Sequence, residues 1–438
     1  CLVRAVHFTK HNIVVEEQMS EKIKVFVIAD HPNAPSGVGI QTKYFIEALL
    51  KTGRYKVFCF GGAIKHPDYT PQTIKPYEED FVIYPVNGYG TQEMVRSALW
   101  TEKPDILWFM TDPRFYEWLW EMEHEVRTNV PMVYYHVWDN HPAPKFNKKW
   151  YDSNDVIACI SKLTYDVVGE VSPDVERHYV PHAIDSEYFY RRSDQEIADL
   201  KEKLFGEDNK RVTFFWNNRN ARRKMSGSVL WWFNEFAEEV GPDNVRLIMH
   251  TEPHDPHGQN LTLMLKDLGA EDGRVQFSTV KMPPDALASV YNAADCTINI
   301  SDAEGFGLAT LESLTCGTPI IANMTGGLQE QITDGEEFFG VGITPTSKAV
   351  IGSQQVPYIY EDRVSKKDFI DALHKIYSMT PAKRSELGTR GMLHTQKNYN
   401  FKTLEKNWVE LMDSIHERYG SWENRKMRDK VWELMEVA

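Results

Sequence analysis

The sequence predicts an α/β protein with two doubly wound domains in tandem and a helical tail. Short apolar runs rich in β-branched and aromatic residues alternate with amphipathic stretches along most of the 438 residues, which is typical of buried parallel strands linked by helices. The alternation breaks over 182–210 and then starts again. A chain of this length exceeds one ordinary domain. We therefore expect a first domain over 19–190, a second over 191–400, and helices over 401–438 that cross back to the first domain.

The first domain is expected to start directly after a short leading segment. Residues 1–18 precede a natural-looking start at Met19, and we expect them to be an upstream extension without functional weight. Helices are expected at 40–51 and 91–102, between the strands. Six apolar runs predict those strands, at 24–30, 56–62, 80–86, 105–111, 131–137 and 155–161.

The second domain repeats this pattern. From about residue 366 the chain is expected to be helical. In open α/β sheets, ligands bind beyond the carboxyl ends of the strands, so the polar residues directly after each strand are the candidates for a site. Five runs predict the strands of this domain, at 212–218, 245–251, 274–280, 296–301 and 319–323.

Composition and charge narrow the range of functions. The formal net charge is −14, and such a surface disfavours non-specific nucleic-acid binding, which needs clustered Lys and Arg. No apolar run approaches the length of a membrane span, and no signal peptide is visible. Five cysteines without a C-x-x-C motif favour buried thiols in a reducing compartment. We expect a cytoplasmic protein.

The turn after the strand 296–301 contains two glycines beside a carboxylate. Glu304, Gly305 and Gly307 lie between this strand and a helix. Glycines there let a ligand approach the backbone, and free amides at a helix N-terminus favour an anion such as phosphate. Glu312 lies two turns along the helix, roughly 9–12 Å from Glu304, on the order of the separation of the two sugars in a sugar nucleotide. The alternative is a capping carboxylate plus a solvent-facing glutamate.

This arrangement resembles the donor-site motif of retaining glycosyltransferases of the GT-B fold, above all glycosyltransferase family 4 (glycosyl transferases group 1). The resemblance rests on E-G-F-G-L-x-x-x-E over 304–312 and C-G-T-P-I-I-A over 316–322, and it extends over about 22–400. It implies two Rossmann-like domains that face each other across a cleft. It also implies that Glu304 orients the transferred sugar, that Glu312 holds the ribose, and that the donor contacts Gly305, Phe306, Gly307 and Leu308.

Two further loops resemble parts of the family pattern. Arg219 and Lys224 stand five apart, like the family's R-x-x-x-x-K pair, which implies that they hold the donor diphosphate. The turn 35–42 contains Gly37 and Gly39 in a G-V-G form, shorter than the family's glycine-rich loop. On the residues alone, the alternatives are a solvated basic loop and tight strand–helix packing.

The acceptor side of the cleft is assigned to residues that follow strands of the first domain. His136 stands where the family has a histidine that contacts the donor sugar, so the resemblance implies a catalytic role for His136. The alternative is a satisfied core histidine. Asp112, Arg114 and Tyr116 follow the strand 105–111, and Asp139 follows His136 closely. On this topology these four side chains are expected to face the acceptor.

The three histidines of 250–258 are expected to be loop residues rather than metal ligands. His250, His254 and His257 could be ligands, but their spacing fits no standard zinc pattern. Enzymes of the GT-B fold generally need no metal, so the resemblance implies neither a metal nor another cofactor.

The resemblance implies a retaining hexosyltransferase. Its donor would be a UDP-, GDP- or ADP-linked sugar, and its acceptor a hydroxyl of a glycan, a lipid or a small molecule. The family is thought to use front-face attack, in which the leaving phosphate takes the acceptor's proton. Two alternatives stay open at this point: a sugar-nucleotide epimerase on the same framework, and a catalytically silent subunit that binds a nucleotide sugar.

Overall fold

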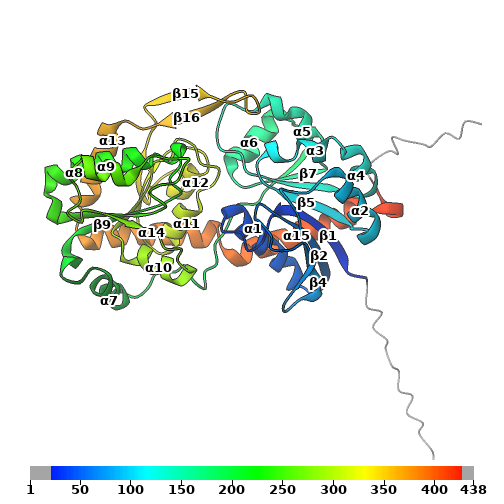
Figure 1. The fold of residues 1–438 in the computed structure, drawn as a ribbon, viewed down its shortest axis with the longest axis horizontal. Coiled ribbons are helices and arrows are strands. Elements are labelled where there is room, and N and C mark those ends of the chain that lie inside the picture. The colour runs from blue at the N-terminus through cyan, green and yellow to red at the C-terminus, as the bar shows by residue number, and fades with distance from the viewer. Residues whose placement is uncertain (1–20, 427–438) are drawn as a thin grey trace, which may run out of the picture.

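The computed structural model describes residues 21–426, which form two α/β lobes, each built on its own sheet (Figure 1). The first sheet has the strand order β3-β4-β2-β1-β5-β6-β7-β8. Its strands are β1 (Ile23–Asp30), β2 (Tyr55–Gly62), β3 (Gln72–Ile74), β4 (Glu78–Pro85), β5 (Ile106–Met110), β6 (Met132–His136), β7 (Val156–Cys159) and β8 (Glu176–Tyr179).

The second sheet has the order β11-β10-β9-β12-β13-β14. All of its pairings are parallel, as are those of the first sheet apart from the antiparallel edge strand β3. The prediction of two doubly wound sheets is therefore confirmed. The strands are β9 (Val212–Asn217), β10 (Val245–His250), β11 (Val275–Ser278), β12 (Cys296–Asn299), β13 (Ile320–Asn323) and β14 (Gly340–Ile343).

The eleven predicted strands all occur, with ends that differ by at most two residues. The strands β3, β8 and β14 were not predicted, because they are short and lack a run of large apolar side chains. An antiparallel ribbon of β15 (Ser347–Ile351) and β16 (Ile359–Arg363) was not predicted either. This ribbon projects from the second lobe, and in the chain it lies between β14 and the helices of the tail.

Helices cover both faces of each sheet. The first turn of α1 is fixed by Ser36, whose hydroxyl accepts a 3.0 Å hydrogen bond from the Gly39 amide. The first lobe contains α1 (Gly37–Leu50), α2 (Gln92–Glu102), α3 (Glu117–Trp120), α4 (Glu123–Asn129), α5 (Lys148–Asp152) and α6 (Lys162–Val171). The second lobe and the tail contain α7 (Asp194–Phe205), α8 (Ser226–Val240), α9 (Leu261–Asp267), α10 (Pro284–Ala293), α11 (Leu308–Thr315), α12 (Leu328–Ile332), α13 (Lys366–Tyr377), α14 (Pro381–Asn398) and α15 (Phe401–Tyr419).

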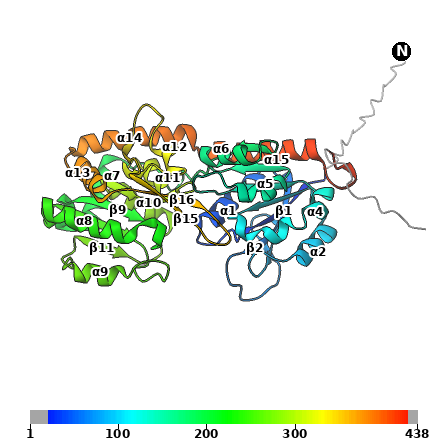
Figure 2. The same ribbon diagram turned by 90° about the horizontal axis from the view of Figure 1, so that it is seen from above.

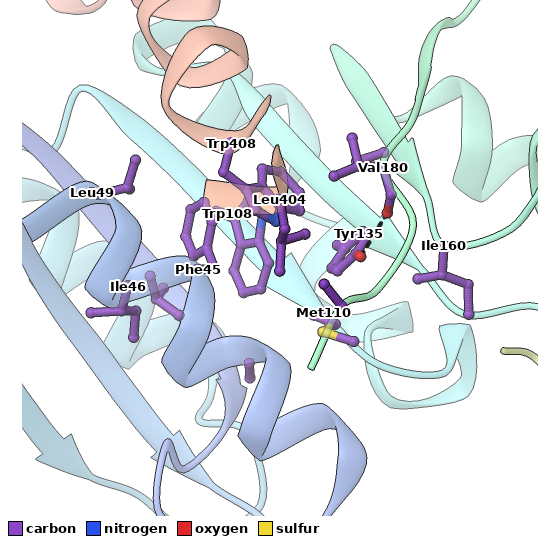
Figure 3. Packing of buried hydrophobic residues seen from close by; sticks show 14 of the residues in the cluster. Phe45, Ile46, Leu49, Trp108, Met110, Tyr135, Ile160, Val180, Leu404 and Trp408 are labelled. Atoms are coloured by element: carbon purple, nitrogen blue, oxygen red, sulfur yellow. Dashed lines mark hydrogen bonds between the residues drawn. The ribbon is translucent and has the colours of Figure 1, made fainter. Parts of the chain in front are cut away.

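The last two helices cross from one lobe to the other (Figures 1 and 2). Helix α14 packs on the second lobe, and α15 returns to the first lobe, where it lies along α1. Trp408 of α15 makes edge-to-face contacts with Phe45, Trp108 and Tyr135 (Figure 3). Because these aromatic rings are fully buried, α15 completes the core of the first lobe. The predicted boundary at 190–191 stays a prediction.

The ribbon β15–β16 reaches across to the first lobe (Figure 1). The amide of Tyr360 donates a 2.7 Å hydrogen bond to the carbonyl of His141, and Tyr358 packs edge-on against Phe146, with 5.0 Å between the ring centroids. The lobes are thus joined by this ribbon as well as by the chain crossings.

Four cysteines, Cys59, Cys159, Cys296 and Cys316, are buried and unpaired. Cys1 and the predicted extension over 1–18 lie outside the described residues, as does the end of the tail after 426. Among the helices of residues 21–426, none combines the length and the apolar character needed to cross a membrane.

Candidate functional site

A cavity of about 470 Å³ lies between the two lobes. It is bounded by residues that directly follow the central strands β1, β5 and β6 of the first sheet and β9 and β12 of the second, where ligands of doubly wound sheets bind. Ten of the residues predicted for the site line it: Gly37, Asp112, Arg114, Asp139, Lys224, Glu304, Gly305, Phe306, Gly307 and Leu308.

Two cations face the carboxylate of Glu304 in this cavity. The ammonium group of Lys224 donates a hydrogen bond to Glu304, and Nη1 of Arg223 lies 3.6 Å from the same carboxylate. Burial raises the pKa of Glu304, but the charges of Lys224 and Arg223 outweigh this effect and hold the pKa below its usual value. Glu304 is therefore ionised, and two cations are gathered where an anionic ligand would enter.

The N-termini of two helices, one from each lobe, meet at the cavity. A Cβ on Gly37, the first residue of α1, would lie 3.1 Å from Cδ1 of Leu308, the first residue of α11. Gly307 precedes α11 with a φ of 93°, a left-handed conformation that favours glycine. Because helix N-termini carry free amides and partial positive charge, this point of the cavity favours an anion.

A loop of the first lobe packs into the second lobe beside Glu304. The carboxylate of Asp139 lies so close to Gly305 that a Cβ there would be 3.0 Å from Asp139 Oδ1. Burial raises the pKa of Asp139, and the Glu304 carboxylate adds to this effect while Arg223 opposes it. Gly305 therefore makes room for a side chain of the opposite lobe, whereas its position in the turn predicts that it makes room for a ligand.

His136 does not face the cavity. It is fully buried, and its ring nitrogens are 3.0 Å from the Tyr134 hydroxyl and 2.7 Å from the Tyr151 hydroxyl. Burial lowers the pKa of His136 to about 3. Side chains alternate between the faces of a strand, and this histidine points away from the cleft. The prediction of a catalytic His136 is wrong, and the alternative of a satisfied core histidine is correct.

Tyr116 is also a core residue rather than an acceptor contact. Its side chain is fully buried, and its hydroxyl lies 2.7 Å from the carbonyl of Ile28 and 2.8 Å from that of Met110. The turn after β5 directs Asp112 and Arg114 to the cavity, where they form a 2.8 Å ion pair, and turns Tyr116 inward.

The basic loop after β9 presents a different arginine from the one predicted. The guanidinium of Arg219 is turned away, where Nε donates to Asp255 at 2.6 Å and Nη2 lies 2.7 Å from His257 Nδ1. Arg223 lines the cavity in its place. The loop carries four basic residues in six positions, and no periodicity in the sequence tells which of them points inward.

Two predicted donor contacts, Glu312 and Gly39, lie beside the cavity rather than on its wall. The Glu312 carboxylate accepts a 2.7 Å hydrogen bond from the hydroxyl of Tyr291 on α10, and burial raises the pKa of Glu312 to about 7. A Cβ on Gly39 would lie 2.8 Å from the carbonyls of His31 and Ala34. Gly39 therefore serves the tight packing of its own turn.

The three histidines of the loop after β10 have separate partners. His250 Nδ1 lies 2.9 Å from Ser278 Oγ, and His254 Nε2 lies 3.2 Å from Thr262 Oγ1, while His257 contacts Arg219. Within residues 21–426, no three His, Cys, Asp or Glu side chains come together as a metal site.

Two parallel α/β lobes around a cleft, with a C-terminal helix that returns to the first lobe, define a protein of the GT-B fold. Residues 255–375 match the family model described as glycosyl transferases group 1.

Curated relatives match parts of the chain. The D-inositol 3-phosphate glycosyltransferase of Acidothermus cellulolyticus is 44% identical over 96 residues, which are 22% of this chain and 19% of that protein. The alpha-monoglucosyldiacylglycerol synthase of Streptococcus pneumoniae is 29% identical over 182 residues, which are 41% of this chain and 40% of that protein. The chain thus spans less than half the length of these relatives.

Solved structures match almost the whole chain in fold. The sucrose-phosphate synthase of Thermosynechococcus elongatus has a TM-score of 0.72 at 16% identity and covers 90% of this chain and 100% of its own. The Anabaena protein HepE in complex with UDP and glucose has a TM-score of 0.66 at 15% identity, with the same coverage. These likenesses confirm the predicted GT-B fold.

Proposed function

We propose that the protein transfers a sugar from a nucleotide-sugar donor to an acceptor hydroxyl with retention of anomeric configuration. The observation that carries the proposal is the joint placement of Glu304, Arg223 and Lys224 in the interlobe cavity. A carboxylate can accept hydrogen bonds from sugar hydroxyls, and two cations can hold a diphosphate.

The charges in the cavity match the needs of such a reaction. Breaking the bond between the sugar C1 and the diphosphate leaves negative charge on the phosphate and positive charge on the sugar ring. Lys224, Arg223 and the amides at the start of α11 would stabilise the phosphate, and the ionised Glu304 would orient the sugar. As the acceptor oxygen bonds to C1, its proton passes to the departing phosphate oxygen. The balanced products are a glycoside and a nucleoside diphosphate.

As the donor we propose, in the first place, a UDP-linked sugar. HepE was solved with UDP and glucose, and an Escherichia coli trehalose-6-phosphate protein with UDP-2-fluoro glucose. GDP- and ADP-linked sugars stay in the proposal as alternatives. For the acceptor we propose a hydroxyl of a glycan, a lipid or a small molecule, since the two named relatives differ in the acceptor that their names suggest. We also propose a cytoplasmic location, in keeping with the four unpaired cysteines of the described chain.

The proposal is tested by a donor screen that measures nucleoside diphosphate release from UDP, GDP and ADP sugars, with proton NMR of the product for the anomeric configuration. We expect release with one nucleotide class and a retained product. Conversion of the donor sugar without release would indicate the epimerase instead. Tight binding of a nucleoside diphosphate without any turnover, over a broad set of acceptors, would indicate the catalytically silent subunit.

A further inference from the structure

One side chain of the first lobe is buried inside the second lobe. Asn140 is 2% exposed, and its Nδ2 donates to Asp362 Oδ2 at 2.8 Å and to Thr325 Oγ1 at 3.2 Å. The Thr325 hydroxyl donates to the same Asp362 oxygen at 2.8 Å. Asp362 lies on β16 and is 3% exposed. A desolvated, charge-assisted hydrogen bond thus joins the lobes.

The backbone around Asn140 is seated just as closely. A Cβ on Gly326 would lie 2.6 Å from the carbonyl of Asp139. On the other side, the His141 carbonyl accepts the hydrogen bond from the Tyr360 amide. Three successive residues of the loop therefore contact the second lobe, with the Asn140 side chain at the centre.

The second-lobe side of this contact connects to the loops that line the cavity. The amide of Asp362 donates to the carbonyl of Asp302 at 2.8 Å, and the amide of Asp302 donates to the carbonyl of Arg223 at 2.8 Å. The amide of Gly327, two residues after Thr325, donates to the carbonyl of Glu304 at 3.0 Å. Asp362 is thus connected through Asp302 to the backbone of Arg223, and the segment after Thr325 is bonded through Gly327 to the backbone of Glu304.

We propose that Asn140 and Asp362 form an interlobe clasp that positions Asp139 of the first lobe against Glu304, Arg223 and Lys224 of the second. The catalytic consequence rests on the function proposed above, whereas the structural consequence does not. Asp139 precedes Asn140, so loss of the clasp frees Asp139 from Gly305 and opens the cleft. Asn140 and Asp362 are positioning residues, since neither lines the cavity.

The clasp is tested with four variants. Asn140→Asp places two carboxylates face to face, and Asp362→Asn replaces the charged acceptor by an amide of the same shape. The double variant Asn140→Asp/Asp362→Asn reverses donor and acceptor and can rebuild the hydrogen bond. Lys348→Met is the matched control. Lys348 Nζ lies 3.6 Å from the other oxygen of Asp362, but this side chain comes from the same ribbon and is 55% exposed, so it does not join the lobes.

Small-angle X-ray scattering gives the radius of gyration, nucleoside diphosphate release gives turnover, and circular dichroism checks folding. We expect Asn140→Asp to increase the radius and to lower kcat/KM by about 30-fold or more. We expect the double variant to recover the radius and to come within about 5-fold of wild-type turnover, and Lys348→Met to match wild type.

Two results would overturn the clasp: an Asn140→Asp variant with wild-type radius and turnover, or a folded double variant as impaired as Asn140→Asp. If Asn140→Asp does not fold, the radius of gyration and the turnover of the double variant and of Asp362→Asn decide whether the clasp exists. If wild type releases no nucleoside diphosphate from any donor, the proposed function fails, and the scattering arm still decides whether the clasp holds the lobes together.

Discussion

The Glu312 carboxylate accepts a 2.7 Å hydrogen bond from the hydroxyl of Tyr291, and burial raises the pKa of Glu312 to about 7. A folded-state pKa above the unfolded value means that the folded protein binds more protons over the interval between them. The contribution of Glu312 to the free energy of unfolding therefore falls as the pH rises from about 4.5 to about 7, and it levels off above that.

We expect Glu312→Gln to be more stable than wild type at pH 8, by about 1–3 kcal/mol, and to show a smaller difference at pH 5. The glutamine keeps the shape and an acceptor for Tyr291 but carries no charge. Urea unfolding at a series of pH values measures this. Glu386→Gln, at an exposed position on α14, is the control and should change little. An unchanged pH dependence in Glu312→Gln would show that Glu312 does not titrate as described.

The two glutamates of the predicted motif are expected to differ in their effect on nucleoside diphosphate binding. A bare diphosphate lacks the transferred sugar, so Glu304→Gln should change its affinity little while it lowers kcat. Glu312→Gln should weaken the affinity by about 1.5–3 kcal/mol at pH 8 if Glu312 makes the predicted charge-assisted hydrogen bond to the ribose.

Calorimetric titration of the nucleoside diphosphate with both variants separates these effects. Equal losses in both would contradict the division between sugar and ribose. Unchanged affinity in Glu312→Gln would leave Glu312 with its contact to Tyr291 alone.

The basic loop gives a prediction that distinguishes three side chains in one stretch. Lys224→Ala and Arg223→Ala should each lower kcat by about 100-fold or more, because both cations line the cavity where the proposed reaction would develop the phosphate charge. Arg219→Ala should cost less than about 10-fold, because its exposed guanidinium is held by Asp255. Steady-state kinetics of the three variants measure this, with circular dichroism as the check on folding. A larger loss of kcat in Arg219→Ala than in the other two variants would contradict the assignment.

Removal of divalent cations should leave turnover intact. Arg223, Lys224 and the start of α11 supply positive charge at the cavity, which is the role that a metal ion would otherwise take. Activity in EDTA, compared with activity in added Mg²⁺, Mn²⁺ or Zn²⁺, measures this. Loss of activity in EDTA that one of these ions restores would show that the reaction needs a metal.

The strands of both sheets could be predicted from the sequence because burial on both faces leaves continuous apolar runs. The ribbon β15–β16 could not, since five of its ten residues are charged or polar, and Glu361 and Asp362 are buried by partners far away in the sequence, among them Arg222 and Asn140. The segment between β14 and α13 contains no apolar run of the kind that predicts the other strands.

Within the site, the turn around Glu304 was predictable because glycines and a helix start are local features of the chain. The directions of His136 and Tyr116 were not, since one step along a strand or turn moves a side chain from the cleft to the core. The position of Arg223 at the cavity could not be predicted, because the neighbouring residues of the loop carry the same charge. Asn140 and Asp362 are 222 positions apart, and no local pattern relates them.

The return of α15 to the first lobe has a consequence for synthesis on the ribosome. Trp408 fills the aromatic cluster around Phe45 and Trp108, which are translated at least 300 residues earlier. The first lobe therefore leaves the exit tunnel with an open apolar groove on α1, and it holds that groove uncovered while the whole second lobe is made. At about 5–20 residues per second, the wait lasts on the order of tens of seconds. Nascent chains stalled before residue 401 are thus the species that a chaperone for exposed apolar surface would bind, and they should lose that affinity once α15 emerges.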